Sequence, residues 1–275
     1  MSRYANTYCL KSKQLFLLSI SILIFHGSGC KSTRRASIRS QDQNRLEQST
    51  GMDIYLLIGQ SNMAGRAEIE LQDQDSLNGV FLFKGTNGNE WERAVNPLNK
   101  YSSIRKKLSM QKLGPGYAFA HAMARSTTKQ IGLVVNAKGG TSIDLWMPGS
   151  DFYYEAVQRT KMAMTYGSLK GILWLQGESD ASNYQLYMPK LLDMIRSFRS
   201  DFGLPELPFI ASQLSGDKPH RDGFNTMILT LPAEIEHAAV IKSKRTSTID
   251  STHFDSQSQR LLGKRYAKKM KKLRK

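Results

Sequence analysis

The stretch "DIYLLIGQSNMAGR", Asp53 to Arg66, decides the fold and raises the question of function. Its apolar start, Asp53–Ile58, predicts a buried strand that stops abruptly at Gly59 and at Ser61, a serine set among small and amide residues. A serine after a strand is usually a turn residue. The other interpretation is a nucleophile mounted on the end of a strand, and the rest of the chain has to decide between the two.

Further apolar runs follow the first one, and amphipathic stretches alternate with them. Nearly continuous apolar strands separated by helices indicate a parallel sheet that is covered on both faces. The sequence therefore predicts one domain over residues 52–275 with a three-layer α/β/α sandwich and a central, mainly parallel sheet, whose ligand site lies at the carboxyl ends of the strands. The predicted strands are 53–58, 79–83, 131–137, 171–176, 208–213 and 238–243, and the predicted helices are 117–126, 153–166, 184–202, 224–236 and 256–273.

The positive charge is concentrated at the two ends of the chain. Of the formal net charge of +16, residues 1–50 carry 8 Lys/Arg against 2 Asp/Glu, and residues 260–275 carry 9 Lys/Arg and no acid. The body, 51–259, has 22 basic and 21 acidic residues, so no basic face for nucleic acid is expected. Near the C-terminus, Tyr266, Met270 and Leu273 recur at helical spacing, which predicts a narrow apolar stripe against the body, with the lysines facing solvent or anionic lipid. The alternative is a frayed, solvated helix end.

The N-terminus has the pattern of an export signal. A basic start precedes the apolar run Leu15–Phe25, which is too short for a comfortable membrane span. The small residues before Cys30 resemble the lipobox of bacterial lipoproteins, although Gly27 stands where an aliphatic residue is usual. Residues 1–30 are therefore predicted to be a signal peptide of lipoprotein type, with ordinary cleavage or a retained anchor as the alternatives. Residues 31–51 are polar and aperiodic, which predicts a flexible tether.

Polar motifs follow three of the predicted strands. Ser61 follows the first, Gly139 and Gly140 in "NAKGGTS" follow the third, and Gln176 in "WLQGESD" follows the fourth. Paired glycines let backbone N–H groups approach a ligand, and a glutamine amide is another donor, so these residues are candidates for binding an oxyanion. Each motif taken singly is more simply a turn or a loop. Together they are hard to assemble by chance.

A candidate base for Ser61 lies near the C-terminus, in "TIDSTHFD". Asp250 is three residues before His253, a spacing at which the carboxylate can reach the near nitrogen of the imidazole while the far nitrogen takes a proton. The alternative is that His253 is an ordinary surface histidine whose hydrogen bonds have no role in catalysis. His220 is the second candidate for the base. The serine motif is not the nucleophile elbow of α/β-hydrolases, because Met63 stands where that motif needs a glycine.

These motifs together resemble an SGNH-type (GDSL-like) hydrolase. The branch they resemble contains the sialate O-acetylesterases and the acetyl xylan esterases of carbohydrate esterase family 6. The resemblance implies a flavodoxin-like α/β/α fold and covers most of the body, from about Asp53 to Ala267. The matching motifs are "GQSNMAGR" around Ser61, "GPGYAFA" at 114–120, "GGTSIDLW" at 139–146, "WLQGESD" at 174–180 and "DSTHF" at 250–254.

The resemblance also implies a role for each matching residue. Ser61 would be the nucleophile, His253 the general base and then the acid, and Asp250 the group that orients His253. The Ser61 N–H, a Gly139 or Gly140 N–H and the Gln176 amide would form the oxyanion hole. Relatives often carry a glycine where this chain has Ser251. The resemblance also implies that three residues support the site or bind substrate: Gln60, Asn62 and Glu178.

The sequence thus predicts an exported serine esterase, periplasmic or on the cell surface and attached to a bacterial membrane through lipid on Cys30. It would remove O-acetyl groups from carbohydrates of the sialate or xylan type through an acyl-enzyme, with no metal or other cofactor and no nucleic-acid partner. The alternative is a non-catalytic carbohydrate-binding or surface-attached module that retains the SGNH fold.

Overall fold

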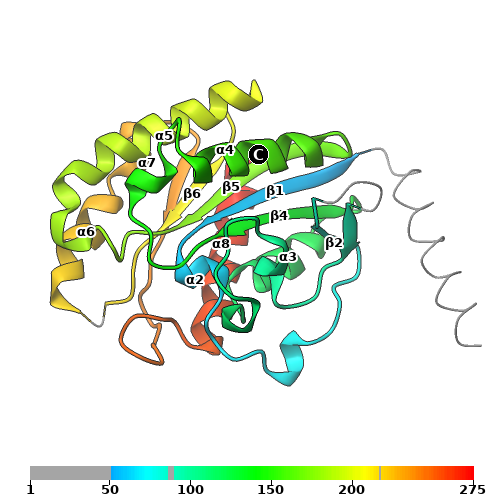
Figure 1. Cartoon of the computed structure of the whole chain (residues 1–275), viewed down its shortest axis with the longest axis horizontal. Coiled ribbons are helices and arrows are strands. Elements are labelled where there is room, and N and C mark those ends of the chain that lie inside the picture. The colour runs from blue at the N-terminus through cyan, green and yellow to red at the C-terminus, as the bar shows by residue number, and fades with distance from the viewer. Residues whose placement is uncertain (1–50, 86–89, 217) are drawn as a thin grey trace, which may run out of the picture. The chain divides into compact units, whose positions relative to one another are not determined.

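The computed structural model describes residues 51–85, 90–216 and 218–275 of the chain. The predictions for the signal peptide 1–30, including Cys30, and for the tether up to residue 50 lie outside the described residues. The described residues build an α/β fold around a seven-stranded sheet (Figure 1). No helix among them is long and apolar enough to cross a membrane.

The sheet has the strand order β3-β2-β4-β1-β5-β6-β7, so β1 lies at its centre between β4 and β5. Neighbouring strands pair in parallel except β2 and β3, which are antiparallel at one edge. The predicted mainly parallel sheet is therefore confirmed. The strands are β1 Met52–Gly59, β2 Val80–Phe83, β3 Trp91–Arg93, β4 Ile131–Ala137, β5 Gly167–Leu175, β6 Phe209–Ser212 and β7 Ala238–Ile241.

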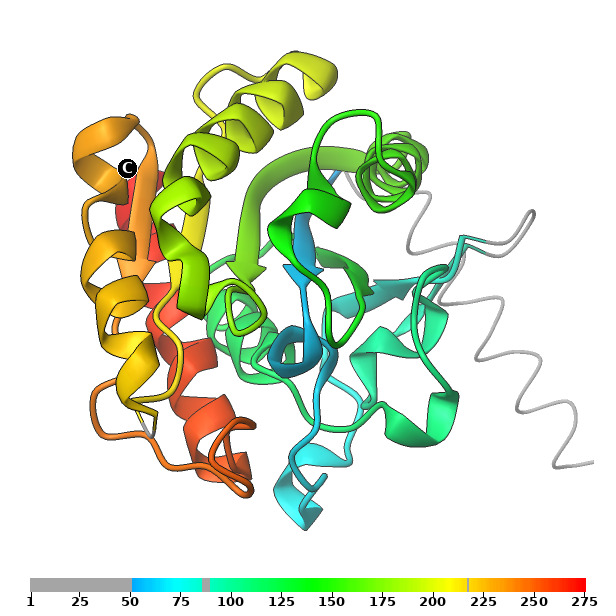
Figure 2. The ribbon, with the colours of Figure 1, turned by 60° about the vertical axis from the view of Figure 1, so that its left-hand side comes forward.

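Helices cover both faces of the sheet, which gives the three layers that the sequence predicts. On one face α3 and α8 pack against each other and against the sheet, and on the other face α4 packs against the central strands and against α5 (Figures 1 and 2). The helices are α2 Ser61–Ala64, α3 Gly116–Ala124, α4 Asp151–Met164, α5 Tyr187–Phe202, α6 Asp222–Ile228, α7 Leu231–Glu234 and α8 Ser256–Leu273.

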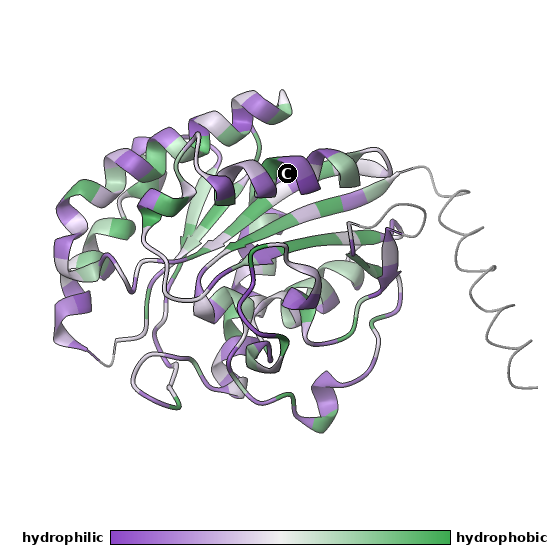
Figure 3. Ribbon diagram, viewed as in Figure 1, coloured by the Kyte–Doolittle hydropathy of each residue, from purple (hydrophilic) through white to green (hydrophobic). Residues whose placement is uncertain are grey.

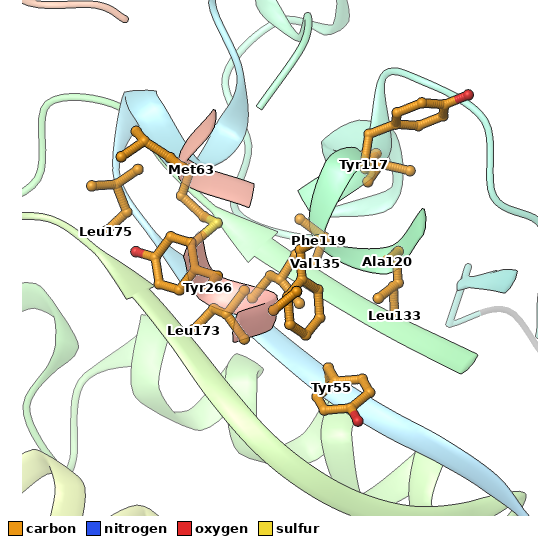
Figure 4. Close-up of a cluster of buried hydrophobic side chains, with 14 of the residues drawn as sticks. Tyr55, Met63, Tyr117, Phe119, Ala120, Leu133, Val135, Leu173, Leu175 and Tyr266 are labelled. Atoms are coloured by element: carbon orange, nitrogen blue, oxygen red, sulfur yellow. The ribbon is translucent and has the colours of Figure 1, made fainter. Parts of the chain in front are cut away.

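The central strands consist mostly of apolar residues, which are green in Figure 3, and every residue of β1 and β4 is buried. Successive side chains of a strand point to opposite faces. Tyr55 and Leu57 of β1 belong to the cluster that includes Phe119 of α3 and Tyr266 of α8 (Figure 4). Leu56, which lies between them and points to the other face, is also fully buried. Burial on both faces explains why β1 is a continuous apolar run rather than an alternating pattern.

Two prolines explain where the helices depart from the predicted ranges. The segment predicted as one helix, 224–236, forms two helices, α6 and α7. In one continuous helix the ring of Pro232 would clash with the carbonyl four residues earlier, and proline has no N–H to donate. The predicted helix 184–202 begins as an α-helix only at Tyr187 and is preceded by a 3₁₀ segment. Pro189 then lies in the first turn of α5, where a missing N–H costs least.

The C-terminal helix packs as its apolar stripe predicts. Tyr266 and Met270 are fully buried and Leu273 packs at the margin of the core. Met270 lies over Gly171 of β5 so closely that a β-carbon at Gly171 would be 2.3 Å from the Met270 methyl carbon. At the end of the helix, Arg274 Nη2 donates to Asp53 Oδ2 at 2.7 Å. The basic tail is therefore part of the folded body.

Met270→Ala is expected to lower the free energy of unfolding by about 2–5 kcal/mol, because it leaves a cavity between α8 and the sheet. Denaturant unfolding followed by circular dichroism measures this change. Lys269→Ala, the exposed neighbour on the same helix, is the matched control and should change stability by less than about 0.5 kcal/mol. Equal stability of the two variants would contradict the packing described here.

Candidate active site

Ser61 lies at the carboxyl end of the central strand, where the chain turns from β1 into α2. The turn needs Gly59, whose φ is 139° and where a β-carbon would lie 2.2 Å from the carbonyl oxygen of Leu175. Gln60 N donates to that same carbonyl at 2.9 Å, which fixes the entry to the turn. The result is a serine with 5% of its surface exposed, held at the sheet edge where ligand sites of parallel sheets lie.

The structure brings His253 and Asp250 to Ser61. His253 Nε2 is 3.0 Å from Ser61 Oγ, and His253 Nδ1 is 2.6 Å from Asp250 Oδ2. The backbone N–H groups of Thr252 and His253 donate to Asp250 Oδ1 at 3.0 and 2.7 Å. A serine, a base and a carboxylate in this sequence of contacts form the arrangement that activates a hydroxyl nucleophile. His220 lines the same cleft, and no hydrogen bond from it to Ser61 is present among the described residues.

The hydrogen bonds also set the charge of Asp250. Partial burial alone would raise its pKa, but the bonds from the His253 ring and from the two backbone N–H groups outweigh burial and hold the pKa below its ordinary value. The carboxylate therefore stays ionised beside the imidazole. The tight turn that makes these bonds places Ser251 at φ 58°, in the left-handed region that favours glycine.

Asn62 fastens the His253 loop to α2. Its Nδ2 donates to the carbonyl of Thr252 at 3.1 Å and its Oδ1 accepts from Phe254 N at 3.0 Å, so it holds the backbone on both sides of His253. The same Nδ2 donates to Glu178 Oε1 at 2.5 Å. Burial of the carboxyl group raises the pKa of Glu178, against the lowering effect of Asn62 and of nearby Arg221. Asn62 and Glu178 thus lie in the site and support the loop that carries the base.

Arg221 holds the same loop from the other side. Its Nη1 donates to the carbonyl of Ser251 at 3.1 Å and its Nη2 to Thr252 Oγ1 at 3.1 Å. The sequence analysis missed this residue, because a lone arginine in a loop carries no motif. The side chain is 2% exposed, and a buried arginine needs several acceptors, which here are the Ser251 carbonyl and the hydroxyl groups of Thr252 and Ser215.

Gly139 packs directly against the serine. A β-carbon at this position would lie 3.1 Å from Ser61 Cβ and 2.8 Å from Arg66 Nη2, so a larger residue would require Ser61 and the Arg66 side chain to shift. Gly140 follows with φ 75°, and both glycines line the cleft beside Ser61. The structure thus brings both predicted glycines to the cleft that contains Ser61.

Gln176 does not present its amide to the cleft. The side chain is 1% exposed, and its Nε2 donates to the carbonyl of Thr141 at 2.8 Å and to Asp180 Oδ2 at 2.5 Å. Gln176 is also not one of the residues that line the cleft. This geometry corrects the expectation that Gln176 itself donates to an oxyanion, because its amide hydrogens are directed at protein acceptors.

The cleft over Ser61 has a volume of about 400 Å³ and a cationic rim. Lys106 and Lys218 make no side-chain hydrogen bond or ion pair with any described residue, and the lining carboxylate, Glu178, is held by Asn62. Such a rim attracts anionic ligands. The basic lining residues are Arg66, Lys106, Lys218, His220 and Arg221.

Three other features were candidates for a functional role: a second cavity, an aromatic side chain and a metal site. A cavity of about 710 Å³ lies at the opposite end of the sheet, beside Leu169 and Arg274, and contains no serine. Trp146 is fully buried against Trp174, so it offers no stacking surface to a sugar. Within 51–85, 90–216 and 218–275, no group of three or more His, Cys, Asp or Glu residues is placed to hold a metal ion.

Comparison with known proteins places these features in the carbohydrate esterase class of hydrolases. More particularly, the chain belongs to the family described as carbohydrate esterase, sialic acid-specific acetylesterase, whose model matches residues 51–272. The match thus covers the sheet and every residue of the site.

Individual relatives agree with this assignment. A protein of Arabidopsis thaliana, described as a probable carbohydrate esterase, is 30% identical over 234 residues, which are 76% of this chain and 86% of that protein. The crystal structure of this same Arabidopsis thaliana protein is similar with a TM-score of 0.73 and 28% identity over 81% of this chain and 98% of that chain. A structure described as a novel carbohydrate acetylesterase from Xanthomonas citri has a TM-score of 0.61 and 22% identity over 81% of this chain and 56% of that chain, which shows the shared fold.

Proposed function

We propose that this carbohydrate esterase is a serine hydrolase of the SGNH type that removes O-acetyl groups from sugars through an acetyl-enzyme. The observation that carries the proposal is the contact of 3.0 Å between Ser61 Oγ and His253 Nε2, with Asp250 on the other ring nitrogen. Ser61 and His253 lie near opposite ends of the domain's sequence and meet only in the folded protein. A serine that only terminates a strand would need no such partners.

In the proposed reaction, Ser61 Oγ attacks the acetyl carbonyl carbon while His253 Nε2 takes the hydroxyl proton. The tetrahedral intermediate collapses, the bond between the acetyl carbon and the sugar oxygen breaks, and the sugar oxygen takes the proton from His253. Water then attacks the acetyl-enzyme, again with His253 as the base, and acetate leaves as Ser61 regains its proton. Asp250 holds the imidazole in the required tautomer and stabilises its protonated form.

The negative charge on the carbonyl oxygen of the intermediate requires donors. Gly139 and Gly140 support this part of the proposal, because they line the cleft and Gly139 packs against Ser61. Their N–H groups and that of Ser61 have no backbone acceptor among the described residues. They are thus available to the oxyanion.

The cationic rim bears on the choice of sugar. A sialate-type substrate carries a carboxylate, whereas the backbone of xylan is neutral, and Arg66, Lys106 and Lys218 favour the former through charge attraction. The proposal therefore ranks acetylated acidic sugars first and acetylated xylan second. A small acyl group suits the cleft, since the serine sits low in it and only 5% exposed.

A comparison of esters tests this proposal. The kcat/KM of the purified protein should fall from p-nitrophenyl acetate to the butyrate and the octanoate, and O-acetylated sialic acid should be a better substrate than acetylated xylo-oligosaccharides. Lys106→Gln should lower kcat/KM for the acidic sugar several-fold and leave p-nitrophenyl acetate unchanged, and added salt should have the same selective effect. Binding of these sugars without any turnover would favour the non-catalytic module instead, and equal rates on both sugars with Lys106→Gln would refute the charge argument.

Export and attachment to a membrane through lipid on Cys30 belong to the same proposal. Their support is the sequence of residues 1–30. Membrane fractionation of the full chain tests them, because Cys30→Ser should release the protein from the membrane fraction. A Cys30→Ser protein that stays with membranes would refute lipid attachment.

A further inference from the structure

The helical layer of α3 and α8 carries positive charge without carboxylates of its own to balance it. Residues 93–143, which include α3, contain no Asp or Glu, and neither do residues 256–275, which include α8. The two helices pack so closely that a β-carbon at Gly263 would lie 2.3 Å from the carbonyl oxygen of Pro115. Lys271 Nζ also donates to the carbonyl of Ala122 at 3.2 Å, so the ends of the two helices form one continuous surface.

Four exposed lysines form a stripe along the outer face of α8 and just beyond its end. They are spaced by four, four and three residues, so they lie one above the other. Arg260 of the same helix pairs with Glu70 and Asp73, and Arg274 pairs with Asp53, whereas the lysines of the stripe form no ion pair with any described residue. The lysines of the stripe are Lys264, Lys268, Lys272 and Lys275.

The stability of the helix does not explain this stripe. Like charges four residues apart, as in Lys264 and Lys268, repel each other and weaken a helix, and Lys268 and Lys272 repeat the same spacing. Cations stabilise the C-terminal end of a helix through its dipole, but this effect is confined to the last turn, and α8 continues to Leu273. A row of lysines that weakens its own helix and has no partner among the described residues indicates an anionic partner outside the protein.

The stripe ends where the described chain begins. Arg274 Nη2 donates to Asp53 Oδ2 at 2.7 Å, and Asp53 is two residues after Gly51, through which residues 1–50 join the domain. Ser61 follows the opposite end of β1, and a strand of eight residues is about 25 Å long. The end of the stripe and the entry of the N-terminal segment are therefore at one edge of the sheet, and the cleft is at the other.

The chemistry of this surface suits a layer of lipid headgroups. Arg125 and Lys129, which follow α3 at the same edge of the sheet, are exposed and extend the stripe into what we call the basic surface. The aromatic residues of the two helices, Tyr117, Phe119 and Tyr266, are buried, so the surface offers no stacking face to a base or a sugar ring. An anionic membrane, by contrast, attracts each nearby basic residue without requiring a defined geometry.

We propose that the basic surface docks on anionic lipid headgroups and thereby directs the catalytic cleft away from the membrane. The choice of a membrane as the partner rests on the proposed attachment through Cys30, whereas the charge of the surface does not. The 20 residues between Cys30 and Gly51 can span at most about 70 Å, so a weak contact of the domain with the same membrane forms repeatedly at high local concentration. The enzyme then acts on carbohydrates beyond the membrane surface rather than on lipids of the layer that holds it.

The test replaces Lys264, Lys268 and Lys272 by glutamine, a good helix former, in the full chain carrying Cys30→Ser. The readout is the ratio of two partition coefficients, one for vesicles of equal parts phosphatidylcholine and phosphatidylglycerol and one for phosphatidylcholine alone, because charge-independent binding by residues 1–50 cancels in it. The ratio should fall by about tenfold to a hundredfold, since each basic residue near an anionic surface contributes a factor of about five. Lys268→Gln alone should lower it about fivefold, and high salt should lower it for the parent chain.

The matched control removes three charges elsewhere, from exposed lysines on α4 and in the loops that follow β3 and β7, and should keep most of the ratio. Its changes are Lys161→Gln, Lys107→Gln and Lys244→Gln. Thermal unfolding shows whether each variant is folded, and the stripe variant should be at least as stable as its parent, because two repulsive pairs are gone. A folded stripe variant with the ratio of its parent would overturn the inference. Loss of heparin affinity with an unchanged vesicle ratio would assign the surface to soluble acidic polymers instead.

The direction of the cleft is tested by fluorescence. The two cysteines of the chain are Cys9 and Cys30, so a chain with both replaced by serine accepts one dye at Thr128→Cys, beside the basic surface, or at Ser179→Cys, at the cleft. Energy transfer to an acceptor on the lipid headgroups should be stronger from the dye on the Thr128→Cys chain, and equal or reversed transfer would overturn the orientation. Neither measurement involves turnover or lipid on Cys30, so failure of the serine mechanism or of lipid attachment leaves both results unchanged.

Discussion

Ser61→Ala is expected to lower kcat for acetyl ester hydrolysis by at least about a thousandfold, the size of effect seen when a member of such a triad is removed. Without the hydroxyl no acetyl-enzyme forms, and His253 Nε2 loses the partner that lies 3.0 Å away. Steady-state turnover of p-nitrophenyl acetate measures the loss. The fold should be unaffected, because the change removes one atom at the cleft surface and leaves the turn glycine, Gly59, in place.

Ser179→Ala is the matched control for this variant, because Ser179 is an exposed serine that lines the same cleft. It should keep wild-type turnover. A serine-directed fluorophosphonate should add its mass to the wild type and to Ser179→Ala, but not to Ser61→Ala. Turnover of the folded Ser61→Ala protein at the wild-type rate would remove the basis of the proposed mechanism.

His253→Ala is expected to match Ser61→Ala in severity, and the double variant should be hardly worse than either, since residues that act as a unit lose their effect together. Asp250→Asn should be milder, because it weakens the orientation and stabilisation of the imidazole and leaves the base itself in place. Turnover of the three variants, with unfolding curves recorded in parallel, measures these effects.

His220→Ala is the control histidine variant, since His220 lines the cleft and makes no described contact with Ser61. It should keep most of the wild-type kcat. If His220→Ala proves to be the damaging change while His253→Ala is tolerated, the base has been assigned to the wrong residue.

Much of the fold was predictable because burial leaves a pattern in the sequence. The central strand β1 is apolar throughout, since helices cover both of its faces, and α8 was predicted with the bounds that the structure shows. The short elements escaped prediction. β3 has only three residues and pairs antiparallel at the sheet edge, and α2 is a single turn set by contacts with the neighbouring loops. Neither is long enough to show a period.

The site was predictable to the extent that its residues lie at strand ends and in short motifs. The approach of Asp250 and His253 to Ser61 follows from such motifs, and so does the place of Gly139. The direction of the Gln176 side chain does not, because it is set by Tyr187, Thr141 and Asp180, which lie together only in the folded protein. A sequence motif shows that a glutamine is present at a position, but the contacts in the folded protein determine where its amide hydrogens point.

The placement of the triad at the two ends of the domain has a consequence for biosynthesis. The hydrogen-bonded Ser61 and His253 are separated by 192 residues, and His253 directly precedes the last helix. At synthesis rates of about 5–20 residues per second, the base is made roughly 10–40 s after the nucleophile. Every nascent or prematurely ended chain that stops before His253 carries a serine with no proton acceptor. Under the proposed mechanism, the chain cannot hydrolyse esters before His253 has been synthesised and has folded against Ser61.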